Sequence, residues 1–167
     1  MNQHARSQWI GHPLRRLEDD ALLCGRGRFA DDLDGAGAAH AAFHRSPHAH
    51  AEIRSIDVAA ARAAPGVLAV FTGRDIVAAG LKPLPFNRMH KRPDGAPMVD
   101  APRYALTPDA ARYVGDPVAM VVARTRDQAR DAADLIEIDW APRPAVVDLV
   151  TSGRDDAPQV WPAAFAP

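Results

Sequence analysis

The sequence predicts an α+β fold, a mixed sheet with two strand–helix–strand units. Two compact apolar runs, Val67–Phe71 and Val118–Ala123, are typical of buried strands, and an alanine-rich stretch with helical character adjoins each of them. The 167 residues are 47% hydrophobic and 25% charged, with a net charge of -1. That length and composition suit one globular domain, which would bury roughly 70% of the surface of the unfolded chain.

The first part of the chain, Trp9 to Leu33, is predicted to be an irregular arm, because it is highly charged and has too little apolar surface to fold alone. Turn residues at Asp34–Gly37 end the arm. Alternating side chains from Ala39 to His44 then predict a half-buried strand, and Ala51–Ile56 is a second extended segment. Because the turn between the two strands is short, we expect them to pair as a hairpin.

A short helix is expected to follow the second of these strands and to complete the first strand–helix–strand unit. Asp57 is the expected N-cap of a helix over Val58–Ala64, which a Pro-Gly pair ends before the buried strand Val67–Phe71. After that strand, Asp75 is expected to cap a single helical turn over Ile76–Ala79.

The segment Leu81–Pro102 has a different character. It holds five prolines, which exclude regular structure and predict a long, stiff loop. Long loops in compact domains are usually functional or disordered. Apolar side chains within the loop favour docking against an apolar surface over a free linker; they are Leu84, Phe86, Met89 and Met98.

The second unit begins with Val118–Ala123, which is predicted to be a central strand covered on both faces. Thr125 and Gln128 form a capping-box pattern at the start of an amphipathic helix, after which Ile136–Trp140 returns as a strand. A last short extended piece is expected at Val146-Val147. The predicted organisation is therefore an arm over residues 1–33, a domain over 34–150 and a Pro/Ala-rich tail over 151–167, with most of 161–167 ordered only if a partner holds it.

Several classes of protein are disfavoured by the composition. No apolar run approaches the ~20 residues that cross a bilayer, so no membrane span is expected. The near-neutral charge offers no field that would attract nucleic acid. The first residues lack the apolar core of a secretory signal, and the single cysteine, Cys24, allows no internal disulfide, so we expect a cytoplasmic location.

Three clusters of residues could carry chemistry, and each has a simpler interpretation. His40, His44, His48 and His50 suggest a metal site, but strand geometry separates the first two by ~13 Å, and hydrogen bonds from the last two to the loop backbone are favoured. Gly25-Arg26-Gly27-Arg28 could cradle an anion, although it matches no nucleotide-binding motif and a tight turn is favoured. Cys24 has no identifiable base. We therefore expect no catalytic, cofactor-binding or metal-binding residues in this chain.

The order of several motifs supplies what these patterns do not. Arg16-Leu17-Glu18-Asp19, Gly25-Arg26-Gly27-Arg28-Phe29 and Asp31-Asp32 are followed by Arg45-Ser46-Pro47-His48-Ala49-His50-Ala51, Pro65-Gly66-Val67, Thr72-Gly73-Arg74-Asp75, Arg112-Tyr113-Val114-Gly115-Asp116-Pro117 and Ile138-Asp139-Trp140. With these motifs the chain, from Ile10 to Leu149, resembles the N-terminal portion of the molybdopterin-binding large subunit of the xanthine dehydrogenase and aldehyde oxidase family of molybdenum hydroxylases.

The resemblance implies the α/β hammerhead domain of that family, which is not catalytic alone. The molybdopterin dinucleotide and its molybdenum would belong to a partner chain, with iron–sulfur and FAD subunits as further members of the complex. The expected contribution of this chain is to pack on the molybdenum-binding chain and to line its substrate funnel with loop residues Leu84, Phe86, Asn87, Met89 and Met98. Arg16, Gly25, Gly27 and Arg45 are expected at the subunit interface.

One alternative from another class remains, an independent small ligand-binding module that reuses the hammerhead fold. Its ligand site would be the histidine-rich hairpin or the long loop. On the first hypothesis the chain is a split subunit, a truncated product or an excised domain.

Overall fold

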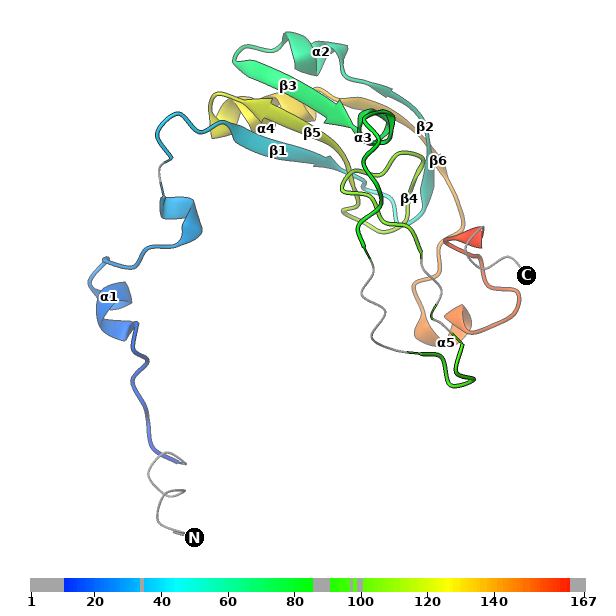
Figure 1. The fold of residues 1–167 in the computed structure, drawn as a ribbon, viewed down its shortest axis with the longest axis horizontal. Helices are drawn as coiled ribbons and strands as arrows, with labels where there is room; N and C mark the ends of the chain where they lie inside the picture. The colour runs from blue at the N-terminus through cyan, green and yellow to red at the C-terminus, as the bar shows by residue number, and fades with distance from the viewer. Residues whose placement is uncertain (1–10, 34, 86–90, 97, 99–100, 163–167) are drawn as a thin grey trace. The chain divides into compact units, whose positions relative to one another are not determined.

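The computed structural model describes residues 11–33, 35–85, 91–96, 98 and 101–162. The chain divides into two compact units, residues 1–38 and residues 39–167. The first contains the helix α1 (Asp19–Leu23) and the single 3₁₀ turn η2 (Ala30–Asp32). The second contains all the strands that the structure describes (Figure 1).

The helix α1 corrects the prediction that the whole arm is irregular. It ends in a hydrogen-bonded turn in which the Arg26 N–H donates to Ala21 O at 2.7 Å and the Gly25 N–H donates to Leu22 O at 3.2 Å. This turn requires a left-handed residue at Gly25, whose φ is +67°. The Gly25–Gly27 segment therefore forms the tight turn that the sequence analysis favours, and its role is to terminate a helix.

The second unit holds two three-stranded antiparallel sheets. The first has the strand order β1-β5-β3 and the second the order β4-β2-β6. The structure thus has the predicted α+β class, with its strands divided between two sheets where one mixed sheet was expected. The strands are β1 (His40–Arg45), β2 (Ala51–Asp57), β3 (Val67–Thr72), β4 (Ala110–Ala111), β5 (Pro117–Ala123) and β6 (Glu137–Pro142).

The predicted hairpin is wrong. Strand β1 pairs with β5, and β2 pairs with β4 and β6, so the two consecutive strands belong to different sheets. The reason lies at the end of β1, where the Ser46 N–H donates to Asp116 O at 2.9 Å and the Gly115 N–H donates to Ser46 O at 2.8 Å. These bonds tie the chain after β1 to the turn before β5, and the non-local pairing replaces the local one.

Both predicted strand–helix–strand units are present, and both connect the two sheets. The unit β2–α2–β3 runs from the second sheet to the first through α2 (Ala59–Ala63). The unit β5–α4–β6 runs from the first sheet to the second through α4 (Arg126–Asp134). The two helices cover the same face of the first sheet, and Figure 1 draws α4 behind β1 and β5.

The start of α4 has the predicted cap, because Thr125 Oγ1 accepts from the Gln128 N–H at 3.2 Å. The N-cap of α2 is Val58, one residue after the predicted Asp57. Asp57 lies just before the cap, and its Oδ1 accepts from the Ala59 N–H at 2.8 Å. The helix α3 (Gly73–Ala78) differs, because it begins earlier than expected. Its N-cap is Thr72, and Asp75 is its third residue, whose carboxylate accepts from the Thr72 N–H at 2.7 Å.

The core lies between the first sheet and the helices α2 and α4. Val70 and Val121 are buried on the sheet side, and they pack with small residues of the helices, Ala61, Ala132 and Ala133. Strand β5 is central in its sheet, as predicted, but only one of its faces is covered along its whole length. On the other face Met120 and Val122 stay partly exposed, which corrects the expectation of cover on both faces.

The loop and the tail contain little regular structure. Within the loop the Leu84 N–H donates to Arg103 O at 2.7 Å and the Arg92 N–H donates to Ala96 O at 2.9 Å, so its base and its tip are each tied by a backbone bond. The structure has no strand at Val146-Val147, where a short extended piece was expected. A short helix, α5 (Leu149–Ser152), begins two residues later. None of the helices in the described part of the chain is long and apolar enough to span a membrane.

Candidate functional site

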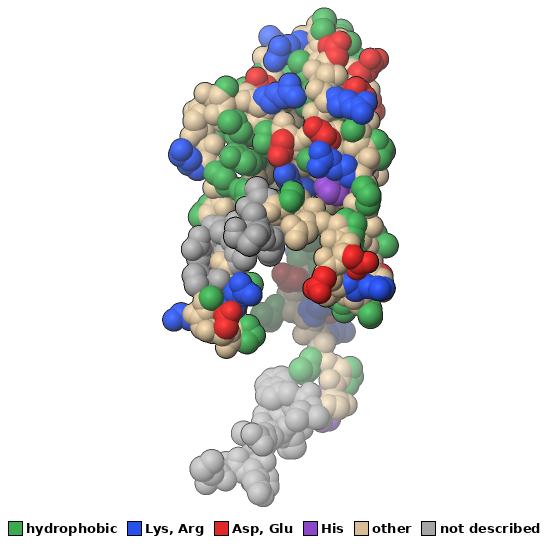
Figure 2. Space-filling view, turned by 90° about the vertical axis from the view of Figure 1, so that its right-hand side faces the viewer, with side chains coloured by type: hydrophobic (Ala, Val, Ile, Leu, Met, Phe, Trp, Pro, Cys, Tyr) green, Lys and Arg blue, Asp and Glu red, His purple; other side chains and the backbone are tan. Residues whose placement is uncertain are grey.

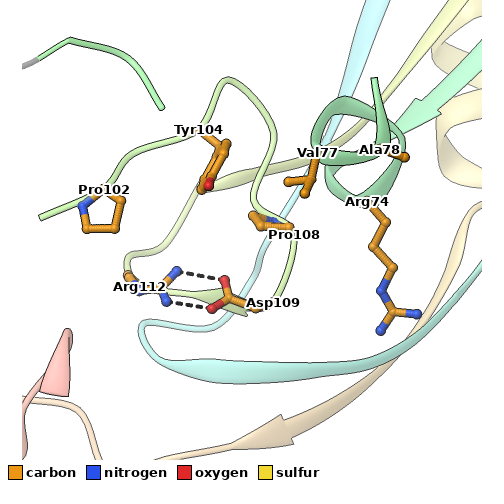
Figure 3. Close-up of a pocket in the computed structure, with 8 residues that line it drawn as sticks. All are labelled: Arg74, Val77, Ala78, Pro102, Tyr104, Pro108, Asp109 and Arg112. Atoms are coloured by element: carbon orange, nitrogen blue, oxygen red, sulfur yellow. Dashed lines mark hydrogen bonds and ion pairs between the residues drawn. The ribbon is translucent and has the colours of Figure 1, made fainter. Parts of the chain in front are cut away.

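A pocket of about 520 Å³ lies where the long loop returns to the body of the second unit. One wall is α3 and the other is the segment that follows the loop (Figure 3). Apolar side chains form most of the lining. Three charged residues also line it, namely Arg74 on one side and the pair of Asp109 and Arg112 on the other. The lining residues are Arg74, Val77, Ala78, Pro102, Tyr104, Pro108, Asp109 and Arg112.

The ion pair between Arg112 and Asp109 forms one edge of this pocket. The guanidinium of Arg112 donates to both carboxylate oxygens of Asp109, at 3.0 and 2.9 Å, and also to Ala110 O at 2.8 Å. Burial alone would raise the pKa of Asp109, but the hydrogen bonds and charge of Arg112 hold that pKa below its ordinary value. The Asp109 carboxylate is therefore ionised at neutral pH, and the pair fixes Arg112 in place.

A second carboxylate, Asp116, lies behind the pair. It is buried, and it accepts from Thr107 Oγ1 at 2.7 Å and from the Arg112 N–H at 3.0 Å. Burial and the negative charge of Asp116 raise the pKa of Tyr113 above its ordinary value. Asp116 thus organises the turn between β4 and β5 through hydrogen bonds that a carboxylate accepts, which is a structural role.

The wall formed by α3 stands close to the opposite backbone. A Cβ atom at Gly73 would lie 2.3 Å from Thr107 O and 2.6 Å from Pro108 N, so only glycine fits at this position. Hydrogen bonds from the hydroxyl and N–H of Thr72 lower the pKa of Asp75. The neighbouring Arg74 donates to Arg54 O at 3.4 Å and makes no ion pair within the described part of the chain.

The pocket can bind but has no catalytic set. Its charged residues are two arginines and a carboxylate that one of them neutralises. Among the described residues no group of three His, Cys, Asp or Glu could hold a metal ion. We therefore assign the pocket no chemical step.

Three of the clustered histidines make contacts within the domain, two through hydrogen bonds to backbone carbonyls and one through ring packing. His50 is buried and its Nδ1 donates to a backbone carbonyl, Pro144 O, at 3.0 Å. This acceptor lies after β6 and not in the loop beside Pro47 where the sequence analysis expected it. His44 donates from Nδ1 to Ala133 O at 2.9 Å, which links β1 to α4. The ring of His48 instead packs against Trp140 in a T-shaped arrangement, with 5.5 Å between the ring centres.

The residues predicted for the substrate funnel are only partly placed. Leu84 and Met98 are 58% and 40% exposed on the loop. Phe86, Asn87 and Met89 lie outside the described residues. The pocket at the base of the loop was not predicted, since the sequence shows Arg74 only as part of a turn and Arg112 only as part of a motif. The prolines of the Pro102–Pro108 segment could have indicated this pocket, because they bring the end of the loop back to the motif that contains Arg112.

The predicted interface residues make contacts within their own units. In the arm, Arg16 donates from Nε to Asp19 Oδ1 at 3.2 Å, while Gly25 and Gly27 belong to the turn after α1. In the second unit, Arg45 donates to Gly115 O at 2.9 Å, and its guanidinium lies 5.4 Å from the centre of the Phe43 ring.

The uncovered face of the first sheet is a second candidate site. Phe43, Met120 and Phe71 stand directly opposite one another across β1, β5 and β3, so their side chains form one apolar row. Phe43 and Phe71 are 45% and 41% exposed. The face drawn in Figure 2 carries interspersed acidic and basic side chains, with apolar side chains gathered at its left.

Comparison with known proteins shows which family has this architecture. The family model for the a/b hammerhead domain of aldehyde oxidase and xanthine dehydrogenase matches residues 24–144. The carbon monoxide dehydrogenase large chain of Afipia carboxidovorans is 40% identical over 90% of this chain and 17% of its own length. The nicotine 6-hydroxylase large subunit of Paenarthrobacter nicotinovorans is 40% identical over 83% of this chain and 16% of its own.

Solved structures agree with these relatives. The crystal structure of quinoline 2-oxidoreductase from Pseudomonas putida 86 superposes with a TM-score of 0.74 at 40% identity, over 89% of this chain and 18% of that one. This chain therefore spans about a sixth of the length of the relatives that it matches. The strand–helix–strand units, the two small sheets and the family match together show that the chain belongs to the aldehyde oxidase and xanthine dehydrogenase family, as its a/b hammerhead domain.

Proposed function

We propose that this chain is the noncatalytic hammerhead part of a molybdenum hydroxylase, and that it packs on a separate chain that binds molybdopterin. The apolar row Phe43–Met120–Phe71 is the observation that carries the proposal. Large side chains in a contiguous exposed row mark interaction surfaces, because isolated exposed apolar residues are ordinary but rows of them are not. The row lies on the first sheet, opposite the face that α2 and α4 already cover.

The loop over residues 81–102 is proposed to line the substrate funnel of the molybdenum-binding chain. Leu84 and Met98 are exposed there without apolar cover from the described part of this chain. Prolines and the bond from the Leu84 N–H to Arg103 O stiffen the base of the loop. A stiff, apolar loop of this kind is suited to forming one wall of a channel, and Phe86, Asn87 and Met89 would complete that wall.

The arm is proposed to contact the partner as well. Its large apolar side chains have little cover within its own unit, since Leu17, Leu23 and Phe29 are 104%, 85% and 65% exposed. Arg16 and the turn at Gly25 and Gly27 give the arm a defined local shape. In the second unit, Arg45 stands beside the apolar row and would add a positive charge to the same interface.

The cofactors of the complex are assigned to other chains. The molybdopterin dinucleotide with molybdenum would be held by the partner, and iron–sulfur and FAD subunits would carry electrons away. One relative is a subunit of a 6-hydroxypseudooxynicotine dehydrogenase complex, which supports a multi-chain assembly. We place that assembly in the cytoplasm.

The test is to isolate the tagged chain gently from its native host and to measure the mass and molybdenum content of what accompanies it. The proposal predicts a larger assembly that contains molybdenum. Recovery of the 18.0 kDa chain alone, without metal, would contradict it.

Variants then locate the contact. Phe71→Ser, alone and combined with Phe43→Ser, should reduce recovery of the molybdenum-containing partner, because each change removes apolar area from the row. Val147→Ser is the matched control, since Val147 is 91% exposed and lies outside the row. Far-ultraviolet circular dichroism of each variant confirms that the chain is folded. Full recovery of the partner with the folded double variant would show that another surface makes the contact.

An independent ligand-binding module is the second candidate function, and the pocket beside α3 favours it. Its volume of about 520 Å³ lies within the usual range for small-molecule sites, and its lining is mostly apolar with Arg74 at one side. The same isolation experiment discriminates, because a module that acts alone should be recovered without a molybdenum-containing partner.

A further inference from the structure

A small cavity of about 40 Å³ lies where three segments of the second unit meet. The segments are the return of the loop at Pro102–Pro108, the turn at Arg112–Asp116 and the tail residue Trp161. We propose that this cavity binds one ordered water molecule, which joins Arg112 to Trp161 and latches the tail onto the base of the loop. Any effect of this latch on substrate access rests on the proposed role of the loop in the funnel. The existence of the water site does not depend on that role.

Two hydrogen-bond donors at this place have no acceptor. Arg112 Nε and Trp161 Nε1 are both buried, and neither has a hydrogen-bond partner among the residues that the structure describes. The two terminal guanidinium nitrogens of Arg112 each have a partner, since they donate to Asp109 and Ala110. A buried N–H group without an acceptor is costly, so native structures usually satisfy such a group with protein or with water.

Water fits this cavity better than an anion does. A cavity of about 40 Å³ accommodates one water molecule, which needs roughly 10–15 Å³ of free volume for its centre. An anion would also accept from two N–H donors, but Arg112 is already neutralised by Asp109, and the buried Asp116 lines the same cavity. Arg103 also lines the cavity, so two arginines face Asp116 there while Asp109 pairs with one of them. These charges balance and give no net attraction for a negative ion, and a neutral molecule of the size of water suits the small volume.

The cavity also offers acceptors for the protons of the water. Asp116 lines it, and its carboxylate accepts from Thr107, from the Arg112 backbone and from the Tyr113 side chain. A carboxylate has about four lone-pair positions, so Asp116 can accept from the water too. Two donors and one acceptor give the water the two to four polar partners that a stable buried site requires.

Arg112 contacts the face of the Trp161 ring. The guanidinium carbon of Arg112 lies 5.6 Å from the centre of the ring, which is cation–π distance. Trp161 also lines a pocket of about 320 Å³ with His50 and Arg143. Asp109, Arg112, the water and Trp161 would thus form one connected chain that holds the tail to the loop base.

Nuclear magnetic resonance on the ¹⁵N-labelled 167-residue chain tests the water site. The Trp161 indole resonance is assigned from Trp161→Phe, which keeps an aromatic ring and removes the N–H donor. We expect a cross-peak between the indole proton and water. A long-lived water gives a cross-peak whose sign differs between the laboratory-frame and rotating-frame experiments, whereas proton exchange gives the same sign in both. A slowly exchanging indole proton without that cross-peak would mean a dry cavity, and an indole proton that exchanges as fast as free tryptophan would mean an unseated tail; either result overturns the proposal.

Hydrogen exchange tests the latch. The amides of Thr107 and Arg112 bond to Pro117 O and Asp116 Oδ2, so their exchange rates report opening of the loop base. Loss of one hydrogen bond in Trp161→Phe should speed their exchange about fivefold, and Trp161→Ala should speed it by tenfold or more. Val147→Ala is the matched control and should leave the rates unchanged. Unchanged rates in Trp161→Ala would overturn the latch, and because no partner is needed, this outcome is distinct from failure of the proposed function.

Discussion

The two faces of the first sheet are made by the same three strands, and they differ in almost every physical respect. On the covered face Val70 and Val121 are 5% and 0% exposed beneath α2 and α4. On the uncovered face their immediate neighbours in sequence, Phe71 and Met120, belong to the apolar row, and no described helix of the second unit packs on it. Side chains alternate along a strand, so a single residue step separates the two environments.

The difference teaches what each face contributes. The covered face is filled with small and branched side chains from within the chain, so its contacts stabilise the fold of the chain itself. The uncovered face displays larger, aromatic side chains, which are typical of surfaces that meet another protein. If the proposed contact uses this row, folding and assembly depend on opposite sides of one sheet, and substitutions one residue apart should separate them.

The largest effect is expected from Val121→Ala on the covered face. It removes two buried carbon atoms and leaves a cavity under α4, so the free energy of unfolding should fall by about 2–3 kcal/mol. Met120→Ala, the adjacent control on the uncovered face, removes a longer side chain but should cost only about 1 kcal/mol, because that side chain is already partly exposed. Urea unfolding measures both. Equal losses would show that the two faces are covered alike in solution.

A smaller effect is expected from His44→Ala. Its imidazole is the polar link on the covered face, where Nδ1 donates to Ala133 O at the end of α4. Removing it leaves that carbonyl without this donor and should cost about 1–2 kcal/mol in the free energy of unfolding. Phe43→Ala on the other face should instead leave α4 undisturbed, as judged by amide exchange within residues 126–134. Faster exchange there in Phe43→Ala than in His44→Ala would contradict the division of roles.

The smallest effect is expected from pH. Hydrogen bonds from Thr72 lower the pKa of Asp75 in the folded chain, so this carboxylate stabilises the fold above the ordinary aspartate pKa of about 3.9. That stabilisation is lost as the pH falls below this value and through the lowered folded pKa. Asp75→Asn should therefore reduce the stability at pH 7 by at most about 1 kcal/mol and have less effect near pH 2. Thermal unfolding at both pH values checks the prediction, and an equal loss at both would refute it.

What the sequence could predict depended on how local the determining interaction is. The start of α4 was predicted correctly, because Thr125 and Gln128 meet within one turn. The hairpin was wrong, because β1 is held by β5, more than seventy residues along the chain, and no local pattern encodes that pairing. The beginning of α3 was misjudged by a few residues, since the capping box runs from Thr72 to Asp75 and Gly73 is selected by its close approach to Thr107.

The candidate site divides in the same way. The loop could be recognised from its prolines, but the pocket beside it could not, because Arg74 and Arg112 are brought together only by the fold of the intervening residues. The cavity at Arg112 and Trp161 could not be predicted either, because the position of the tail residue Trp161 also depends on the fold.

The order β1-β5-β3 also constrains how the chain folds during synthesis. The strands β1 and β3 are the first two of their sheet to leave the ribosome, yet neither pairs with the other, and both wait for β5 to enter between them. Until then each has unpaired backbone edges, which are the usual starting points of aggregation. We therefore expect the first half of the nascent chain to depend on chaperones until residue 123 has emerged, and the whole domain to fold slowly for its size.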